Sequence, residues 1–339
     1  MTDAARLLTR CVDALPDAAF ALDRDWHVLC ANKAARLLFP KMREADPVSR
    51  TVRAPEILDA LRMSLQSGTV TRNWLTRVPV ERQFEVHVAA LGPEIPGALL
   101  VTLRETTETR RIERMRVDFV ANASHELRTP LASLLGFVET LQGPARNDTA
   151  AQERFLGIMG EQVRRMSRLV DDLLSLSRIE QSLHMRPAAS VDLVSVAGHM
   201  ADALAPMAED RGVTIRFDDC EPVYVWGDRD ELLRVAENLI ENAIKYGGPG
   251  VVQLIVAQDA ECGTLSVQDN GPGIASEHIP RLTERFYRID AAASRAKGGT
   301  GLGLAIVKHI VARHRGRLSI DSRPGQGARF SIAVPLSPP

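Results

Sequence analysis

The stretch from residue 106 to 142 constrains the fold more than any other part of this sequence. It contains no glycine until Gly136, and apolar residues recur along it at steps of three and four. These residues are Val117, Val120, Ala123, Leu127, Leu131, Leu134, Val138 and Leu141. The spacing places them on one face of a long helix, as in the seam of a coiled coil. The run GPARND (143–148) predicts the end of this helix.

A second amphipathic helix is predicted to begin near Thr149. One face of it carries Phe155, Met159, Met166, Leu169, Leu173 and Leu176, with Gln162 as the polar member. Two helices joined by a short loop form an antiparallel hairpin. Because one hairpin cannot bury two broad apolar faces, we expect a homodimer in which two hairpins form a four-helix bundle. A stalk that only dimerises the chain is the simpler alternative.

Mixed α/β segments flank the hairpin. Before it, strands are expected at 19–23, 27–32, 70–78, 82–91 and 97–105, with helices at 32–39 and 54–68. After it, Pro187 marks a linker. Helices at 192–211, 229–246 and 301–314 then alternate with strands near 213–217, 222–226, 251–258, 263–269, 317–321 and 328–334. This pattern indicates an α/β sandwich rather than a regular βαβ repeat, so the whole chain is a multidomain α+β protein.

Composition excludes several classes of protein. Of the 339 residues 45% are hydrophobic and 25% charged, as in soluble globular domains, and the net charge of −1 gives no basic field for nucleic acid. The four cysteines are scattered, which argues against a disulfide framework or a zinc site. A spanning helix needs about 20 consecutive apolar residues, and no run approaches that length. We therefore expect a cytoplasmic chain as given, with a membrane contact only if a segment is missing from it.

The run ASHELRTP (123–130) interrupts the first helix with an unusual group of residues. His125 lies two positions from both Ala123 and Leu127, hence about 200° from each on a helix, and should face solvent. Glu126 could hold one imidazole proton and so activate the ring as a nucleophile. Thr129, one turn further on, could position a water molecule. A histidine without a role is the plain alternative.

Pro130 has no N–H for the carbonyl of Glu126 and permits a bend beside the histidine. A hinge there would let the helix present His125 to different partners. The plain alternative is a kink that only suits the bundle.

Glycine-rich blocks follow in the last third of the chain. In NLIENAIKYG (238–247), Asn238 and Asn242 lie one turn apart, and amide oxygens suit a Mg²⁺ ion that already holds phosphates. In VQDNGPGI (267–274), the Asp269 carboxylate could accept from an exocyclic amine such as that of adenine. ERFYRID (284–290) supplies an aromatic residue beside an arginine.

The block GGTGLGLAIVKHI (298–310) is a glycine loop that opens directly into a helix. The free N–H groups and dipole of such a helix favour an anion such as phosphate. The spacing is neither that of a P-loop nor that of GxGxxG after a strand. One glycine turn alone is weak evidence, but these blocks in this order predict a nucleotide site.

Together these motifs resemble those of bacterial sensor histidine kinases. ASHELRTP resembles the H box of that family, NLIENAIKY the N box, DNGPGI the first G box, RFYRID the F box and GTGLGLAIVKHI the second G box. The likeness covers residues 120–339. Residues 11–105 more loosely resemble a PAS sensor domain. The runs HELRTPLASLLGFVETLQGPAR and RLVDDLLSLSRIE look most like those of phosphate-regulon sensor kinases.

The resemblance implies a PAS-like domain at 11–105, a dimerisation and phosphotransfer domain at 106–184 and a Bergerat-type ATP-binding domain at 187–336. It implies phosphorylation of His125, proton removal by Glu126 and a role of Thr129 in the reverse, phosphatase reaction. The phosphoryl group would pass to a response regulator receiver domain.

The same resemblance implies ATP and Mg²⁺ as cofactors. Mg²⁺ would be held by Asn238 and Asn242, and residues 290–300 would form a lid over ATP. The other nucleotide-binding residues would be Lys245, Tyr246, Asp269, Gly271, Gly273, Arg285, Phe286, Gly299, Thr300, Gly301, Leu302 and Gly303. The sequence departs from the family at Ala328, where threonine is more usual; we expect little effect, since that position supports the sheet.

Two other functions fit parts of the sequence. An ATPase of the gyrase and Hsp90 kind would carry a glutamate at the first N-box position to activate water, but Asn238 stands there. A PAS dimerisation scaffold with an inactive kinase unit would not need the intact motifs. Failure to bind ATP would favour the scaffold.

Overall fold

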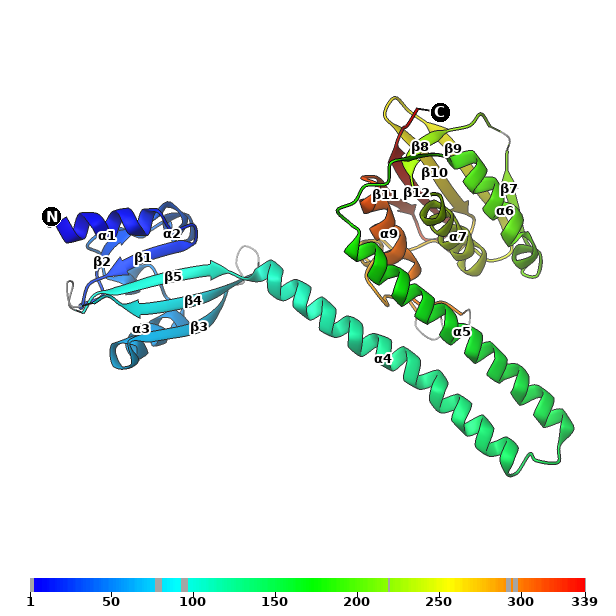
Figure 1. Ribbon diagram of the computed structural model, residues 1–339, viewed down its shortest axis with the longest axis horizontal. Helices are drawn as coiled ribbons and strands as arrows, with labels where there is room; N and C mark the ends of the chain where they lie inside the picture. The colour runs from blue at the N-terminus through cyan, green and yellow to red at the C-terminus, as the bar shows by residue number, and fades with distance from the viewer. Residues whose placement is uncertain are drawn as a thin grey trace. The chain divides into compact units, whose positions relative to one another are not determined.

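The computed structural model describes residues 3–76, 81–92, 97–218, 220–290, 294 and 298–338, without the side chains of residues 3, 5 and 111–116. The chain divides into two compact units, Met1–Asp118 and Phe119–Pro339 (Figure 1). Each is described by itself. No helix among the described residues is both long enough and apolar enough to cross a membrane.

The first unit is an antiparallel sheet with short helices. Its elements are α1 (Asp3–Asp13), β1 (Ala18–Leu22), β2 (Val28–Ala31), α2 (Lys33–Leu38), the 3-10 turn η1 (Val48–Arg50), α3 (Pro55–Ser67), β3 (Thr69–Thr76), β4 (Arg82–Ala90) and β5 (Leu99–Glu105). The strand order is β2-β1-β5-β4-β3. The sequence predicted these strands and both α2 and α3, but not α1.

Buried Asn32 explains how α2 begins. Its side-chain oxygen accepts hydrogen bonds from the backbone N–H groups of Ala35 and Ala19, at 2.9 and 3.1 Å. Its amide nitrogen donates to the carbonyl oxygens of Leu15 and Asp17. One side chain therefore caps the helix and ties it to the adjacent strand.

The second unit begins with the predicted helical hairpin. Helix α4 (Thr107–Gln142) enters it from the first unit and continues through Pro130, and α5 (Thr149–Gln181) returns alongside α4 (Figure 1). The Asp148 carboxylate caps α5 by accepting from the N–H of Ala151. The rings of Phe137 and Phe155 stack near the turn with their centroids 5.3 Å apart. Below, the hairpin means residues 119–182.

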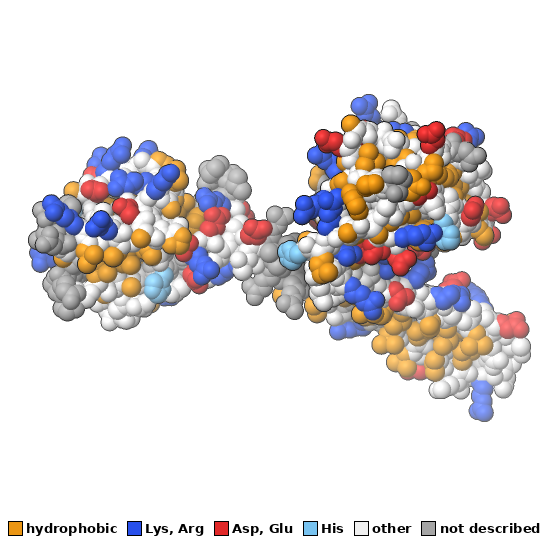
Figure 2. Space-filling view, turned by 45° about the horizontal axis from the view of Figure 1, so that its top comes forward, with side chains coloured by type: hydrophobic (Ala, Val, Ile, Leu, Met, Phe, Trp, Pro, Cys, Tyr) orange, Lys and Arg blue, Asp and Glu red, His pale blue; other side chains and the backbone are white. Residues whose placement is uncertain are grey.

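The apolar faces of α4 and α5 are only partly covered within one chain. Of the predicted seam on α4, Leu127 and Leu134 are partly buried, but Val117, Val120 and Leu131 are more than half exposed. The large apolar side chains that remain exposed are Val117, Val120, Leu131 and Leu135 of α4 and Leu156, Val163, Val170 and Leu174 of α5, named here the open stripe. Figure 2 shows hydrophobic side chains gathered along the free part of the hairpin.

The rest of the second unit, residues 187–338, is named here the C-terminal module. Its elements are β6 (Ala189–Asp192), α6 (Leu193–Glu209), β7 (Val213–Phe217), β8 (Tyr224–Gly227), α7 (Arg229–Tyr246), β9 (Gly250–Gln258), β10 (Cys262–Asp269), the 3-10 turn η2 (Ile279–Arg281), α9 (Gly303–Arg313), β11 (Arg317–Ser322) and β12 (Ala328–Pro335). The main sheet has the order β11-β12-β10-β9-β7. Helices α6, α7 and α9 pack on it around a shared apolar core.

Three features of the module position its site. Strand β6, which the sequence did not predict, pairs with β8 beside the main sheet. The Asp192 and Asp228 carboxylates cap α6 and α7 by accepting from backbone N–H groups of the first helical turn. The core of the module also includes Leu169, Leu176 and Ile179 of α5, so the hairpin and the module share buried apolar surface.

Candidate functional site

A cavity of about 610 Å³ opens where α7, the end of β10 and the glycine loop before α9 meet. Sequence blocks that are far apart along the chain come together in its wall. Among the predicted site residues, those in the wall are Asn238, Asn242, Lys245, Tyr246, Asp269, Gly273, Gly299, Thr300, Gly301 and Gly303. The cavity is therefore the place where the predicted nucleotide-binding motifs converge.

Helix α7 turns its polar face to the cavity because its other face is fully buried in the core. The Asn238 side-chain nitrogen donates to the carbonyl of Arg234 at 2.8 Å, which turns the amide oxygen toward the glycine loop. A Cβ atom at Gly303 would lie 2.3 Å from that oxygen, so no larger residue fits there. Asn242 lies one turn further along the same face. Their amide oxygens are a donor set that fits Mg²⁺.

Asp269 ends β10 with a side chain only 7% exposed. Its Oδ1 atom accepts from the N–H groups of Gly271 and Ala328, at 2.8 and 3.3 Å. Both donors reach the same oxygen, which leaves Oδ2 for a ligand in the cavity. Burial raises the pKa of the Asp269 carboxyl, and the two backbone hydrogen bonds oppose that shift. A buried carboxylate with one free oxygen suits recognition of an amine such as that of adenine.

Gly273 and Ala328 complete this side of the cavity. Gly273 has a φ of +69°, and a Cβ atom there would lie 2.0 Å from the carbonyl oxygen of Arg323, so only glycine fits. Ala328 belongs to β12, as expected for a residue that supports the sheet. It also lines the cavity and donates its N–H to Asp269, which the sequence did not indicate.

The glycine loop leads into α9 with unpaired helix N–H groups. No side chain caps this helix at Leu302. The loop is fixed on its other side because the N–H of Gly299 donates to the carbonyl of Ser294 at 2.9 Å, and the Ser294 hydroxyl is 2.7 Å from that of Tyr246. A helix of this kind offers N–H groups and a positive dipole end to a phosphate. Residues 291–293 and 295–297 of the predicted lid lie outside the described residues.

Four predicted nucleotide-binding residues lie outside the wall of the cavity. Leu302 is fully buried in the core, and Gly271 supports Asp269 through its N–H. Arg285 and Phe286 face the hairpin instead, as the next paragraph describes. The two residues that follow them in the chain, Tyr287 and Arg288, line the cavity and were not predicted.

Phe119 of α4 contacts both Arg285 and Phe286. The Arg285 guanidinium lies 4.9 Å from the centroid of the Phe119 ring, and the Phe286 ring centroid is 5.9 Å from it. Arg285 also forms an ion pair with Glu180 of α5. The aromatic and arginine pair of the F box therefore joins the module to the hairpin.

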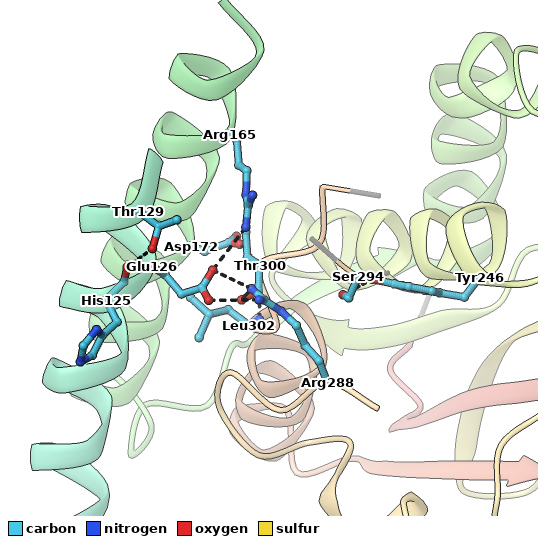
Figure 3. Close-up of polar contacts among 10 residues, drawn as sticks. All are labelled: His125, Glu126, Thr129, Arg165, Asp172, Tyr246, Arg288, Ser294, Thr300 and Leu302. Carbon is cyan, nitrogen blue, oxygen red and sulfur yellow. Dashed lines mark hydrogen bonds and ion pairs between the residues drawn. The ribbon is translucent and has the colours of Figure 1, made fainter. Parts of the chain in front are cut away.

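His125 is exposed on α4, as its position two residues from the apolar seam predicts. Figure 3 shows its ring on the side of α4 away from the glycine loop. The Thr129 hydroxyl donates to the backbone carbonyl of His125 at 3.2 Å. Both side chains are thus accessible from solvent on one helix.

Glu126 does not contact the His125 ring in this structure, in contrast to the predicted arrangement. Its carboxylate instead accepts from Arg165 of α5 at 3.3 Å and from Arg288 of the module at 3.1 Å (Figure 3). The reason is geometric, since adjacent side chains on a helix diverge by about 100°. Arg288, only 6% exposed, also donates to the carbonyl of Thr300 at 2.7 Å.

Asp172 of α5 is a further residue of the cavity wall that sequence reasoning missed. Its Oδ2 accepts from the Thr300 hydroxyl and its Oδ1 from Arg234, both at 2.9 Å. Burial raises the pKa of this carboxyl, and the contacts with Thr300 and Arg234 oppose the shift. The only signal in the sequence was an acidic pair inside the run RLVDDLLSLSRIE, which reads as an ordinary solvated helix face.

Two protein families match this chain. Residues 115–182 match the His Kinase A (phospho-acceptor) domain, and residues 227–338 match the histidine kinase-, DNA gyrase B- and HSP90-like ATPase family. The matched regions contain His125 and the whole cavity wall contributed by α7, β10 and the glycine loop.

The similarity to named sensor proteins extends beyond these two domains. The Phosphate regulon sensor protein PhoR of Pseudomonas aeruginosa is 35% identical over 327 residues, which cover 94% of this chain and 72% of that protein. Sensor protein kinase WalK of Staphylococcus saprophyticus is 33% identical over 338 residues, 97% of this chain, and the chain spans 55% of its length.

A solved structure has the same fold. Histidine kinase ThkA, in a complex with response regulator protein TrrA, is similar over 96% of this chain and 98% of its own, with a TM-score of 0.51 and 17% identity. The match covers the PAS-like sheet, the hairpin and the Bergerat-type module. From the two domain matches and the relationship to PhoR, this chain belongs to the family of sensor histidine kinases, with a PAS-like domain before the catalytic core.

Proposed function

We propose that this chain uses ATP to phosphorylate its own His125 and passes the phosphoryl group to an aspartate of a response regulator receiver domain. The observation that carries this proposal is the convergence of the N box, both G boxes and Thr300 on one cavity, in the same unit as an exposed histidine. The ATP-binding family of the module supports the choice of nucleotide.

In this proposal each part of the cavity has one task. Asp269 Oδ2 accepts from the adenine amine, and the free N–H groups at α9 with Lys245 bind the phosphates. Asn238 and Asn242 hold Mg²⁺, which would neutralise charge that develops on the phosphates. Phosphoryl transfer requires mainly such positioning and charge stabilisation. Lys245 is paired with Glu241 in this structure, so that ion pair must rearrange when phosphates bind.

The transfer itself takes place at the imidazole. A ring nitrogen of His125 attacks the γ-phosphorus, the bond to the β,γ-bridging oxygen breaks, ADP leaves and the ring loses a proton. The proton passes to Glu126, whose carboxylate must first leave Arg165 and Arg288 and turn toward the ring. Because the His125 ring faces away from the glycine loop here, transfer requires the module to move on the hairpin or the cavity of a second copy to approach.

The second copy would cover the open stripe, so we propose a homodimer with a four-helix bundle. Eight large apolar side chains on two neighbouring helices are more than soluble monomers usually expose together. The phospho-acceptor family of the hairpin supports this assignment. Within it, the domains proposed are 11–105, 106–184 and 187–336.

We further propose a place in phosphate-starvation signalling, supported by the likeness to PhoR over most of both chains. The reverse reaction, dephosphorylation of the regulator, would use the Thr129 hydroxyl to position water. Thr129 is exposed one turn from His125, where a docked regulator could reach both.

Autophosphorylation with γ-labelled ATP and Mg²⁺ tests the proposal. The wild type should gain an acid-labile, alkali-stable label, and His125→Ala should gain none. His184→Ala, at an exposed histidine outside the site, is the matched control and should be labelled like the wild type. Phosphate released to water at equal rates in all three proteins would instead support the ATPase, and absence of nucleotide binding would support the scaffold.

A further inference from the structure

Asp172 belongs to the hairpin, yet its carboxylate forms part of the cavity of the C-terminal module. It is the acceptor for the hydroxyl of Thr300, which lies within the glycine loop (Figure 3). It is also the acceptor for the guanidinium of Arg234 on α7. Its side chain is 18% exposed. The helix that follows the phospho-acceptor helix therefore reaches the loop proposed to bind phosphates.

Thr300 is held in this position by several contacts. Its hydroxyl donates to Asp172 and accepts from the N–H of Leu302 at 3.3 Å, and its carbonyl accepts from Arg288 at 2.7 Å. Gly301 next to it has a φ of +75°, a conformation that glycine adopts readily. The conformation of the glycine loop is thus fixed partly by a residue of the hairpin.

A phosphate at this loop would meet the Asp172 carboxylate. Both carry negative charge, and the low dielectric of a half-enclosed cavity strengthens their repulsion. Arg234 also lines the cavity, but its guanidinium forms an ion pair with Asp172. Less of its positive charge is therefore available to a ligand. Asp172 therefore disfavours phosphate in two ways, by its own charge and by its hold on Arg234.

We propose that Asp172 is a positioning residue of the glycine loop, and that the Asp172–Thr300 contact and nucleotide phosphate exclude one another. Nucleotide binding then frees the loop from α5 and loosens the module from the hairpin. The inference rests on the proposed nucleotide site. It adds that Asp172 is the residue that links nucleotide binding to movement of the module relative to the hairpin.

The affinity of the full-length chain for ADP with Mg²⁺, measured by calorimetry, tests this proposal. Asp172→Asn keeps an acceptor for Thr300 but removes the charge, and we expect ADP to bind at least about five-fold tighter, within the usual range of coupling between sites. Tighter binding is an effect that a merely damaged fold would not produce. The KM for ATP in autophosphorylation should fall by a similar factor.

Glu161→Gln is the control, because it removes the same charge from an exposed residue of α5 that does not line the cavity. We expect it to change the ADP affinity by less than about two-fold, as for a screened surface charge. Thr300→Ser keeps the hydroxyl that contacts Asp172, so adding Asp172→Asn to it should tighten ADP binding by the same factor as in the wild type. In a Thr300→Val background, Asp172→Asn should still tighten ADP binding, but by a smaller factor than in the wild type, since the contact is already absent and only the charge and the pairing with Arg234 remain to be removed.

Unchanged or weaker ADP binding by Asp172→Asn would overturn the proposal. Equal gains in Asp172→Asn and Glu161→Gln would also overturn it, because the effect would then be general charge rather than this contact. If the wild type binds no ADP at all, the proposed nucleotide site fails, and this result is distinct from a failure of the Asp172 proposal alone.

Discussion

Asp269 illustrates how a single buried residue can select a ligand. Oδ1 is occupied by two backbone donors, so in the proposed nucleotide site the chemistry of the other terminal atom decides which base is accepted. In Asp269→Asn the side-chain oxygen can keep both backbone bonds, and an amide nitrogen then replaces Oδ2. We expect ADP affinity to fall about ten-fold or more, the loss typical of a hydrogen bond to a charged group. Calorimetry with ADP and GDP checks this: the preference for ADP should shrink, because guanine presents an acceptor, and an unchanged ratio would contradict the assignment.

His314 makes the stability of the module depend on pH. It is fully buried, and burial lowers the pKa of its imidazole. Nδ1 lies 2.8 Å from the carbonyl of Ile310 and Nε2 accepts from the N–H of Asp228 at 3.0 Å, so the ring is neutral with its proton on Nδ1. A lowered pKa in the folded state means that this stabilisation is present above the unfolded pKa of about 6.5 and is lost as the pH falls below it.

We therefore expect thermal stability to decline below that pH, with a contribution from His314 of up to about 1.4 kcal/mol per pH unit. His314→Gln offers an amide oxygen to Asp228 and should reduce this decline in differential scanning calorimetry between pH 8 and 5.5. His184→Gln, at an exposed position, should leave it unchanged. Equal slopes in all three proteins would show that another group is responsible.

At the scale of the element, the open stripe is the apolar surface of α4 and α5 that the proposed homodimer would cover. Leu135 is 60% and Val163 54% exposed. In light scattering we expect a dimeric wild type and a mainly monomeric double variant Leu135→Glu/Val163→Glu, because charges would have to be buried in the bundle. Ser133→Glu, two residues from both Leu131 and Leu135 and so on the other side of α4, should remain dimeric. A dimeric double variant would place the interface elsewhere.

The period of apolar residues predicted α4 and the start of α5 to within about a residue, because burial of a face determines where a helix can run. It did not separate the residues that pack inside the hairpin, such as Leu127, from those that await a partner, such as Leu131. Apolar residues spaced three and four apart show how wide the apolar face of a helix is, but not which residues pack against that face. Strand β6 was missed because ASVD has little apolar alternation and is stabilised by pairing with distant β8.

The glycine motifs predicted the cavity because positions whose backbone conformation or close contacts admit only glycine can be recognised in the sequence. Asp172 left none: its role arises from how the hairpin packs on the module, and a carboxylate on a helix looks the same whether it meets water or Thr300. The same holds for Arg285 and Phe286, whose motif gave their position in the chain but not the direction in which they point.

At the scale of the whole second unit, three ion pairs join the hairpin to the module, each with its acidic residue on the hairpin and its arginine on the module. Glu126, Asp172 and Glu180 belong to the hairpin, and each is paired with an arginine of the module: Arg288, Arg234 and Arg285 respectively. Because Glu180 is 36% exposed, its pair with Arg285 should contribute only about 1 kcal/mol. Glu180→Arg should lower the unfolding midpoint of this unit by about 2–4 °C, and the exchanged pair Glu180→Arg/Arg285→Glu should recover most of it. Calorimetry provides the comparison; failure of the exchange to recover stability would show that geometry, not charge, joins the two parts there.

The order of strands in the main sheet has a consequence for how the protein is made. The last strand, β12, lies between β11 and β10 rather than at an edge, and its first residue supplies the N–H that holds Asp269. During synthesis, β10 and β11 therefore emerge from the ribosome without the strand that joins them. The first unit has by then been complete for the time needed to translate more than half of the chain. A chain that ends shortly before residue 328 would therefore keep all residues of the first unit and lose the strand that completes the main sheet and the cavity wall at Asp269.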